Sequence, residues 1–550
     1  MARLDRLASV KEVAQMGATL GRELTYEMLK AVSSLDEETL QKGLRQLVEA
    51  ELLYQRGIHP QATYIFKHAL IQETAYQSML RSTRQKYHGK IARVLEERFL
   101  ETAELQPELL GHHFTEAGLA EQAIPYWQRA GEIAIRRSAH VEAISHFTKG
   151  LELLKALLKT PERAQQELAL QSALGPALIA TKGYGAPEVE HAYARALELC
   201  REVGEPPQLF QVMGGLWNWY LLRAEHQAAR ELGNQLLTLA QRGQNPALLM
   251  AAHRALGTTL FWLGEFSLAR EHLEQGIGLY DPQQHRSLAF LYGATPGVTC
   301  RVYAAWTLCS LGYPDQALQL SHEAITLAQE LSHPFSLTWA LIFAALVHHF
   351  RREAQAAQQQ AEAAITLSTE QGFAQWLALG TFERGWALAA QGQVVDGIAQ
   401  MSQGQAGWRA TGAELTRPWF LATLAEAYRH GGQADVGLRA VAEALALVEK
   451  RRERASEAEL YRVKGELLLM QAGPAAQKAE TWFRQAIDVA RRQGAKSLEL
   501  QAAMSLGRLW QTQGKKEEAR RLLSEIFGWF TEGFGTADLK DAKSLLEELS

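Results

Sequence analysis

The stretch LGTTLFWLGEFSLAREHLEQG, Leu256 to Gly276, shows the unit from which most of this 550-residue chain is built. Small residues stand at Gly257, Ala269 and Gly276, and Leu273 lies four residues after Ala269 on the same helical face. A short glycine-containing turn separates two segments with helical periodicity. The pattern predicts two helices joined by a tight turn, with the small residues where the helices approach each other.

The same pattern recurs at a nearly constant interval. LGRLWQTQGKKEEARRLLSEI (Leu506 to Ile526) and GHHFTEAGLAEQAIPYWQRA (Gly111 to Ala130) repeat it. The positions equivalent to Gly257 in successive units are Trp217, Gly257, Ala305, Ala345, Gly385, Ala425, Gly465 and Gly507. Five of these seven intervals are 40 residues, and the longest, of 48 residues, contains a Pro/Gly-bearing insertion between Tyr280 and Cys300. A fixed period of this size indicates a helical-repeat array.

The array predicts the fold class. One helix pair cannot bury its apolar face alone, so successive pairs must stack and wind into a superhelix. The segment between Thr160 and Pro206 keeps the helix pair but has a glycine-bearing connection. We therefore expect an all-α protein whose residues 101–550 form an α-α superhelix.

The first hundred residues follow a different pattern. Helices are predicted at Val10–Gly17, Thr25–Val32 and Asp36–Ala50, the third behind the start signal SSLDEE. The segment LLYQRGIHPQATYIF then offers two short β-favouring pieces around a Gly/Pro turn. Three helices followed by a two-stranded wing predict a small winged-helix domain, which with its connecting helices would occupy residues 1–100.

Composition limits the class of protein. The apolar content of 47% suits a folded chain, and the formal net charge of -4 gives no overall attraction to nucleic acid or acidic lipid. Three cysteines provide no disulfide framework, and the N-terminus has no secretory h-region. The longest apolar run, Leu337 to Val347, is too short to cross a bilayer. These features predict a cytoplasmic protein without a membrane partner.

No motif for catalysis is visible. The phosphate loop G-x-x-x-x-G-K-[ST], a dinucleotide-binding G-x-G-x-x-G after a strand, the zinc helix H-E-x-x-H and a nucleophile elbow are all absent from the sequence. His112-His113 and His348-His349 are adjacent pairs whose side chains diverge on a helix, which argues against a metal site. We expect a non-enzymatic chain with no cofactor and no metal.

A winged helix invites a DNA-binding interpretation, because such domains place their third helix in a groove. The predicted third helix carries only Lys42 and Arg45 as cations. Its acidic residues are Asp36, Glu37, Glu38, Glu49 and Glu51. Phosphates would repel this face, so nucleic acid is not the expected partner. The next helix, within 81–98, is basic, and we interpret its charges as a solvated face beside a buried stripe of Ile91, Val94 and Leu95.

The repeat resembles the tetratricopeptide repeat, which also places small residues at these positions. The resemblance covers roughly Pro107 to Phe534, with a period longer than the usual 34 residues, and this variant is similar to the superhelical region of the maltose-regulon activator family. LASVKEVAQMGATLGRELTYEMLKAV, LDEETLQKGLRQLVEAELL and FKHALIQETAYQSML further resemble a bacterial family of multidomain signalling ATPases, many with a class III nucleotide cyclase. The resemblance implies the C-terminal, regulatory half of such a protein.

One residue acquires a role from this resemblance alone. Related switch ATPases place a winged-helix histidine against a bound nucleoside diphosphate, and His68, directly after the second predicted strand, matches that position. The resemblance therefore implies that His68 senses nucleotide when an ATPase domain is supplied. The alternative is that His68 caps the next helix or fills a domain junction.

The concave face of the array is the other candidate site. Aromatic and arginine side chains are favoured anchors for protein partners. The candidates expected on this face are Arg254, Trp262, Arg301, Trp306, Phe350, Phe382, Trp386, Trp419 and Arg429. The competing interpretation is that most of these aromatic rings are core between helices.

These observations predict a regulatory or scaffold module that binds a protein or peptide through its superhelix. In the family that it resembles, the module would be coupled to an AAA-type ATPase or cyclase domain. Two alternatives remain: the regulatory half of a split ATPase or adenylate cyclase, and a winged-helix transcription regulator.

Overall fold

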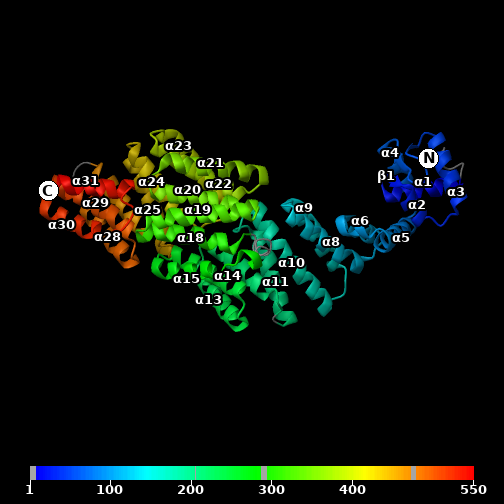
Figure 1. Ribbon diagram of the computed structural model, residues 1–550, viewed down its shortest axis with the longest axis horizontal. Helices are drawn as coiled ribbons and strands as arrows, with labels where there is room; N and C mark the ends of the chain where they lie inside the picture. The colour runs from blue at the N-terminus through cyan, green and yellow to red at the C-terminus, as the bar shows by residue number, and fades with distance from the viewer. Residues whose placement is uncertain (1–7, 205, 286–293, 472–477) are drawn as a thin grey trace. The chain divides into compact units, whose positions relative to one another are not determined.

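The computed structural model describes residues 8–204, 206–285, 294–471 and 478–550 (Figure 1). Contacts between residues divide the chain into two compact units, Met1–Leu170 and Gln171–Ser550. Residues 286–293, inside the insertion noted in the sequence, lie outside the described residues. The domain boundary expected between residues 100 and 101 reflects a change of sequence pattern and stays a prediction.

The first unit begins with a small mixed domain and continues as helices. Its elements are α1 (Ala8–Leu20), β1 (Glu23–Thr25), α2 (Tyr26–Val32), α3 (Glu37–Glu49), β2 (Leu53–Arg56), β3 (Thr63–Phe66), α4 (Ala69–Gln77), α5 (Arg81–Arg98), α6 (Leu100–Leu105), α7 (Pro107–Glu116), α8 (Ala120–Arg136) and α9 (His140–Lys155). Helix α10 (Pro161–Lys182) contains the division between the units.

The three predicted helices and two predicted strands of this unit are present, with one strand more. Asp36 begins α3, as the start signal indicated, because its carboxylate accepts a hydrogen bond from the Thr39 N–H at 2.9 Å. The sheet has the order β1-β3-β2, and both pairings are antiparallel. Strand β1 was not predicted, since three residues give too short an alternation to recognise.

Helix α4 contacts β3 and α1, α5 contacts α1 and α2, and the following helices up to α9 extend the first unit. Ile91 and Leu95 of α5 are buried, so the apolar stripe expected beside the basic face is confirmed. Gly131 of α8 shows why a small residue is needed, since a Cβ there would lie 2.4 Å from the Phe147 ring of α9. The helix pair of the repeat therefore already exists in this unit.

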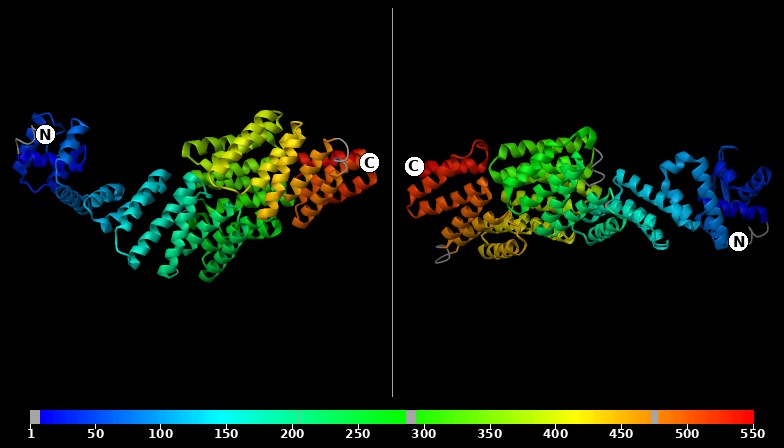
Figure 2. Two further views of the ribbon diagram at one scale, coloured as in Figure 1. Left: turned by 180° about the vertical axis from the view of Figure 1, so that it is seen from behind. Right: turned by 90° about the horizontal axis from the view of Figure 1, so that it is seen from below.

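The second unit consists of stacked helices. They are α11 (Pro187–Val203), α12 (Leu209–Leu222), α13 (His226–Gly243), α14 (Pro246–Trp262), α15 (Phe266–Gly278), α16 (Pro282–His285), α18 (Pro296–Leu311), α19 (Pro314–Glu330), α20 (Pro334–Phe350), α21 (Ala354–Gln371), α22 (Ala374–Ala390), α23 (Val394–Ala410), α24 (Arg417–His430), α25 (Ala434–Arg451), α26 (Glu457–Leu469), α28 (Ala479–Gln493), α29 (Lys496–Thr512), α30 (Lys516–Phe527) and α31 (Ala537–Glu548). Both views of Figure 2 show them side by side as successive pairs.

Where the repeating position is Gly257, Gly385 or Gly465, it lies on the first helix of its pair and faces the second. A Cβ at Gly385 of α22 would lie 2.6 Å from the backbone N of Met401 in α23. A Cβ at Gly257 of α14 would lie 2.6 Å from the Leu273 side chain of α15. The first helices of neighbouring pairs also contact one another, as α20 contacts both α18 and α22. The predicted all-α superhelix is confirmed.

Hydrogen bonds also join segments about 190 residues apart, so that one part of the second unit packs on another. Arg223 donates to the Gly412 carbonyl at 2.9 Å across 189 residues. Ser497 donates to the Cys309 carbonyl at 2.7 Å across 188 residues. Because the same separation recurs, we interpret these bonds as links between successive superhelical turns.

The same turn-to-turn contacts explain two glycine-bearing connections. The Leu222 carbonyl at the end of α12 accepts hydrogen bonds from the N–H groups of Glu414 and Leu415, at 2.7 and 2.9 Å. A Cβ at Gly185, in the connection between α10 and α11, would lie 2.7 Å from the Gly412 backbone. The connection therefore needs glycine because another turn of the chain packs directly against it.

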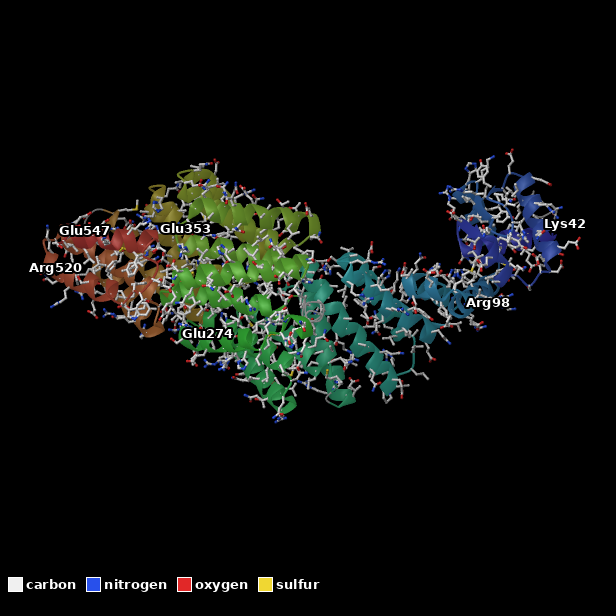
Figure 3. All side chains as sticks on the ribbon, viewed as in Figure 1. Lys42, Arg98, Glu274, Glu353, Arg520 and Glu547 are labelled. Atoms are coloured by element: carbon white, nitrogen blue, oxygen red, sulfur yellow. The ribbon has the colours of Figure 1, made fainter. Side chains whose placement is uncertain are left out.

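The outer face of the array is charged. Figure 3 shows Glu274 of α15, Arg520 of α30 and Glu547 of α31 among the side chains of this surface, and all three are exposed. Among the described helices, none combines the length and the apolar character needed to cross a membrane.

Candidate functional site: the axis of the superhelix

The first helices of the pairs direct one repeating position toward the superhelix axis. It is the residue directly after the small position of each unit. In the described chain these residues are Asn218, Thr258, Trp306, Leu346, Trp386, Glu426, Glu466 and Arg508. The first four line an enclosed cavity, and the last four line a larger groove, which Trp306 also reaches. The repeat thus builds two neighbouring spaces from equivalent positions.

The enclosed cavity has a volume of about 30 Å³, and half of its lining residues are aromatic. Seven of the thirteen tryptophans in the chain line it, among them Trp262, Trp306 and Trp419. The Trp306 ring centroid lies 5.2 Å from that of Trp262 and 6.1 Å from that of Trp419. These three rings are predicted site residues, and they are at the same time 8% exposed or less.

The groove has a volume of about 1090 Å³ and receives most of the predicted residues. It is lined by the same three tryptophans and by Phe350 and Trp386. Its walls come from the ends of α14, α18, α20 and α22 and from the inner faces of α24, α26 and α29, and α31 also contributes. The structure therefore brings five of the predicted aromatic residues to one space.

A histidine fixes the aromatic wall of the groove. The His349 ring stacks on Trp386 with centroids 3.7 Å apart and an interplanar angle of 12°. His349 Nδ1 lies 3.1 Å from Oε2 of Glu383, a carboxylate that is fully buried. Because the carboxylate orients the imidazole, Trp386 is held with one ring face covered.

Another part of the groove lining carries paired charges. Arg429 donates from Nε and Nη2 to both carboxylate oxygens of Glu426, at 3.1 and 2.8 Å. Arg462 makes the same two-point contact with Glu459, at 2.8 and 2.6 Å. Such forked contacts are the strongest ion pairs between side chains. Arg429, another predicted residue, therefore lies in the groove with its geometry fixed.

The charge of Glu426 is compensated by neighbouring cations. Burial alone would raise the pKa of the Glu426 carboxyl, but Arg462 and hydrogen bonds from His430 and Arg429 outweigh burial and hold the pKa far below its usual range. The Arg462 guanidinium lies 3.7 Å from Glu426 and about as near to Glu466, at 4.0 Å. The charges of the wall are thus shared among neighbouring helices.

Four of the ten predicted site residues lie elsewhere. Arg254 lies in the enclosed cavity, 4.6 Å from the centroid of the Trp217 ring. Arg301 lines a separate groove of about 730 Å³, where its Nε is 3.9 Å from Glu323. Phe382 is fully buried in the core.

His68, the fourth, belongs to the first unit. It occupies the N-cap position of α4 and is exposed, and its side chain makes no capping hydrogen bond there. The suggestion that it caps this helix is therefore wrong for the side chain. Nothing in the structure bears on a nucleotide, and that role stays a prediction.

The sequence did not indicate Glu426 or Arg462, and His349 was considered only as one of an adjacent histidine pair. The signal was available, because Glu426 and Arg508 occupy the position next to the repeating small residue, as Trp306 does. The prediction favoured aromatic anchors, so it missed the charged residues at equivalent positions. Among the described residues, no group of histidines, cysteines and carboxylates is arranged to hold a metal ion.

No family model matches the chain. An uncharacterized protein of Rhizobium meliloti is 24% identical over 514 residues, which are 92% of this chain and 49% of that protein. The chain thus spans about half the length of this curated relative.

The likeness to solved structures concerns the fold alone. The crystal structure of a Rap protein complexed with competence and sporulation factor has a TM-score of 0.50 at 11% identity, over 67% of this chain and 98% of that one. A STAND signal-transduction ATPase with a tetratricopeptide repeat sensor, from Pyrococcus horikoshii, has a TM-score of 0.31 at 10% identity, over 98% of this chain and 65% of that one. The chain has a tetratricopeptide-like helical-repeat fold.

Proposed function

We propose that this chain is a non-catalytic regulatory or scaffold module that binds a peptide or an extended protein segment in the groove. The groove itself carries the proposal. It offers half-buried aromatic rings at Phe350 and Trp386 beside a wall of charged side chains. Interfaces commonly combine such aromatic anchors with arginines.

The chemistry of the groove favours a partner with both apolar and polar groups. Its acidic and basic side chains already pair with one another, as in Arg429–Glu426 and in the contacts of Arg352 with Asp538 and Asp541, at 3.0 and 2.7 Å. A highly charged ligand would have to compete with these pairs. A peptide with one or two bulky apolar residues would need only the aromatic wall and hydrogen bonds to the charged one.

The regulatory role proposed for the chain involves the first unit. Its elements follow the order helix–strand–helix–helix–strand–strand. We propose that they form a winged-helix domain, which serves as a coupling domain rather than a DNA reader. The third helix, α3, begins with Asp36, Glu37 and Glu38, which would repel phosphates. An ATPase or cyclase domain is the partner that the family resemblance implies for this coupling.

The test is a selection of binding peptides on the complete chain. A random library of twelve-residue peptides would be enriched on the immobilised protein, and selected peptides measured against Trp386→Ala. We expect at least a tenfold loss of affinity, because an anchor ring at an interface is worth more than about 1.4 kcal/mol. Trp482→Ala is the matched control, since Trp482 is also half-buried but stacks on Tyr461 outside the groove.

Two results would contradict the proposal. One is a library from which no peptide is enriched. The other is a set of selected peptides that bind Trp386→Ala and the wild-type chain equally well, which would place the binding surface elsewhere.

A further inference from the structure

Two buried histidines, His88 and His113, join α5 to α7 inside the first unit. His88 Nδ1 lies 2.8 Å from His113 Nδ1, and the two residues are 1% and 2% exposed. The other ring nitrogen of His88, Nε2, lies 2.9 Å from the hydroxyl of Tyr76 on α4. Two hydrogen bonds between titratable groups thus connect three helices.

Helix α5 attaches the small mixed domain to the helices that follow it. It contacts α1 and α2 of that domain and also α7. Ile91 and Leu95 of α5 and Leu110 and Phe114 of α7 belong to one buried apolar core. A change at the histidine pair therefore acts where the small domain joins the helices that lead into the array.

The hydrogen bond between the two rings requires one donor and one acceptor. A neutral imidazole carries a single N–H, so one Nδ1 bears a proton and the other accepts it. One further proton would place a positive charge on a buried ring, which is costly. A second would make both Nδ1 atoms donors that face each other. The contact is therefore most stable while both imidazoles are neutral.

The groups around the pair do not offset such a charge. Burial, His112 and Arg84 lower the pKa of His88 to about 4. Burial, His88 and His112 lower the pKa of His113 to about 3. The titratable and charged groups near these rings are Tyr76 of α4, Arg84 of α5, His112 and Glu116 of α7 and Lys149 of α9. Glu116 is the one acidic group in this set, and it is exposed.

We propose that the His88–His113 pair is an acid-sensitive joint, which holds α5 against α7 while both rings are neutral and releases them when the rings take up protons. The joint controls how firmly the small domain is attached to the helices behind it. It lies wholly within the first unit, so the inference is independent of the groove and of the proposed function.

The direction of the response follows from proton binding. Imidazoles that reach solvent on opening have an ordinary pKa near 6.5, above their values in the closed joint, so the open form binds protons first as pH falls. The closed joint is fully favoured above about pH 6.5 and is progressively lost below it. From pH 7 to pH 5.5 each ring changes the opening equilibrium roughly eightfold, and the two together change it roughly 70-fold.

The first test is hydrogen exchange of the complete wild-type chain at pH 7 and pH 5.5. Expressing the rates as protection factors removes the intrinsic pH dependence of exchange. Protection of the α5 and α7 amides should fall by tens of fold at pH 5.5, whereas protection of α29 in the second unit should change severalfold at most. Unchanged protection of α5 and α7 would overturn the proposal, and so would an equal fall in α29.

The second test uses His113→Asn, whose amide keeps a hydrogen-bonding group near the position of Nδ1 but does not titrate in this range. Loss of the ring lowers protection at both pH values, so the readout is the ratio of protection at pH 7 to that at pH 5.5, which a purely structural role would leave unchanged. That ratio should fall to roughly tenfold or less in α5 and α7.

His272→Asn is the matched control. His253 and His272 make the same contact, Nδ1 to Nδ1 at 2.9 Å, between α14 and α15 of the second unit. This variant should keep the wild-type ratio in α5 and α7. His88→Gln removes the other ring of the joint and covers the case in which His113→Asn does not fold. A wild-type ratio in either joint variant, or a reduced ratio in His272→Asn, would overturn the proposal.

Discussion

The enclosed cavity and the groove are made from equivalent positions of one repeat, yet one is part of a core and the other is a surface. At the residue after the small position, the cavity side has Asn218, Thr258, Trp306 and Leu346, and the groove side has Trp386, Glu426, Glu466 and Arg508. The backbone pattern is the same on both sides. The side chains at this position are all uncharged on the cavity side, and three of the four on the groove side are charged.

Contacts between turns add to the difference. Around the cavity, the loop before α24 is attached to the end of α12 by the hydrogen bonds from Glu414 and Leu415 to the Leu222 carbonyl. Aromatic rings fill most of the axis there. Toward the groove, the axis is lined by ion-paired side chains such as Glu426 and Arg462, which are 3.7 Å apart. A repeat protein can thus carry a core and a binding surface along one axis.

The largest expected effect comes from removing the ring that separates the two spaces. Trp306 is 3% exposed and contacts Phe261, with ring centroids 4.6 Å apart, and Phe343, at 5.4 Å. Trp306→Ala should lower the free energy of unfolding by about 3–5 kcal/mol, because a large cavity would remain. Trp386→Ala, with its ring half-buried in the groove, should cost roughly 1–2 kcal/mol. Urea denaturation of both variants, followed by circular dichroism, measures the difference.

Equal destabilisation by the two substitutions would break the comparison, since it would mean that Trp386 belongs to the core as fully as Trp306 does. Hydrogen exchange of α18 and α20 in Trp306→Ala gives a local check. Exchange should rise in these helices, where the ring packs, before it rises in α29.

The second effect concerns the small position itself, which both spaces need. A Cβ at Gly385 would lie 2.6 Å from the Met401 N and 2.8 Å from the Gly397 carbonyl oxygen, both backbone atoms that cannot turn aside. Gly385→Ala should therefore destabilise the chain by about 1–3 kcal/mol. At the equivalent Gly507 a Cβ would meet only Leu545 at 3.6 Å, so Gly507→Ala should be neutral or stabilising by up to about 1 kcal/mol.

Thermal unfolding of the two alanine variants, side by side, measures this contrast at one repeat position. A lower Tm for Gly507→Ala than for Gly385→Ala would show that helix spacing is not what selects glycine here.

Much of this fold could be predicted from the sequence, because spacing and residue size determine it. The 40-residue interval placed Gly257, Ala345 and Gly465 on first helices, and the structure has them there. What the spacing could not show is which segments meet about 190 residues apart. Contacts such as Arg223 to Gly412 depend on how tightly the superhelix winds, and small angles summed over several repeats determine that winding.

The site was predictable in part for the same reason. Trp262, Trp306 and Trp419 were expected either on the concave side or in the core. They are buried and also line the groove, because the axis changes from core to groove at these rings. Phe382 and Arg301 were also expected on the concave face, but Phe382 lies in the core and Arg301 lines a separate groove. The position of a residue within the helical turn decides in which direction its side chain points. Helical phase relative to the small position is the information that a residue-type search leaves out.

A smaller effect should follow from pH on the groove side. The pKa of Glu426 is held well below its usual value in the folded chain, so the unfolded chain binds the proton first as pH falls. The stability that Glu426 contributes is present above about pH 4.5 and should decline by about 1 kcal/mol for each pH unit below it. Glu426→Gln has no carboxyl to titrate, so its unfolding free energy should fall less between pH 5 and pH 3.

Denaturation midpoints of the wild type and of Glu426→Gln at pH 7, 5, 4 and 3 measure this difference in pH dependence. If the wild type and Glu426→Gln lose stability in parallel as pH falls, the ion pairs do not hold this carboxylate ionised. They would then not stabilise the groove side of the axis. Trp306→Phe, which changes no charge, should follow the wild-type pH dependence.

The smallest effect tests whether hydrogen bonds, as well as ion pairs, keep the groove wall in place. Ser505 is 4% exposed, and its hydroxyl donates to Glu466 at 2.5 Å, from the neighbouring first helix. Ser505→Ala should cost about 1 kcal/mol, because the bond has a charged acceptor but Glu466 keeps Arg462 nearby. Ser402→Ala, which removes an exposed hydroxyl on α23, should change stability by a few tenths of a kcal/mol at most. A Tm difference of about 1 °C between the two variants would show that the carboxylate at the axis-facing position is held by its neighbours. No difference would mean that the open side depends on charge alone, and the contrast with the aromatic side would then be one of residue type rather than of packing.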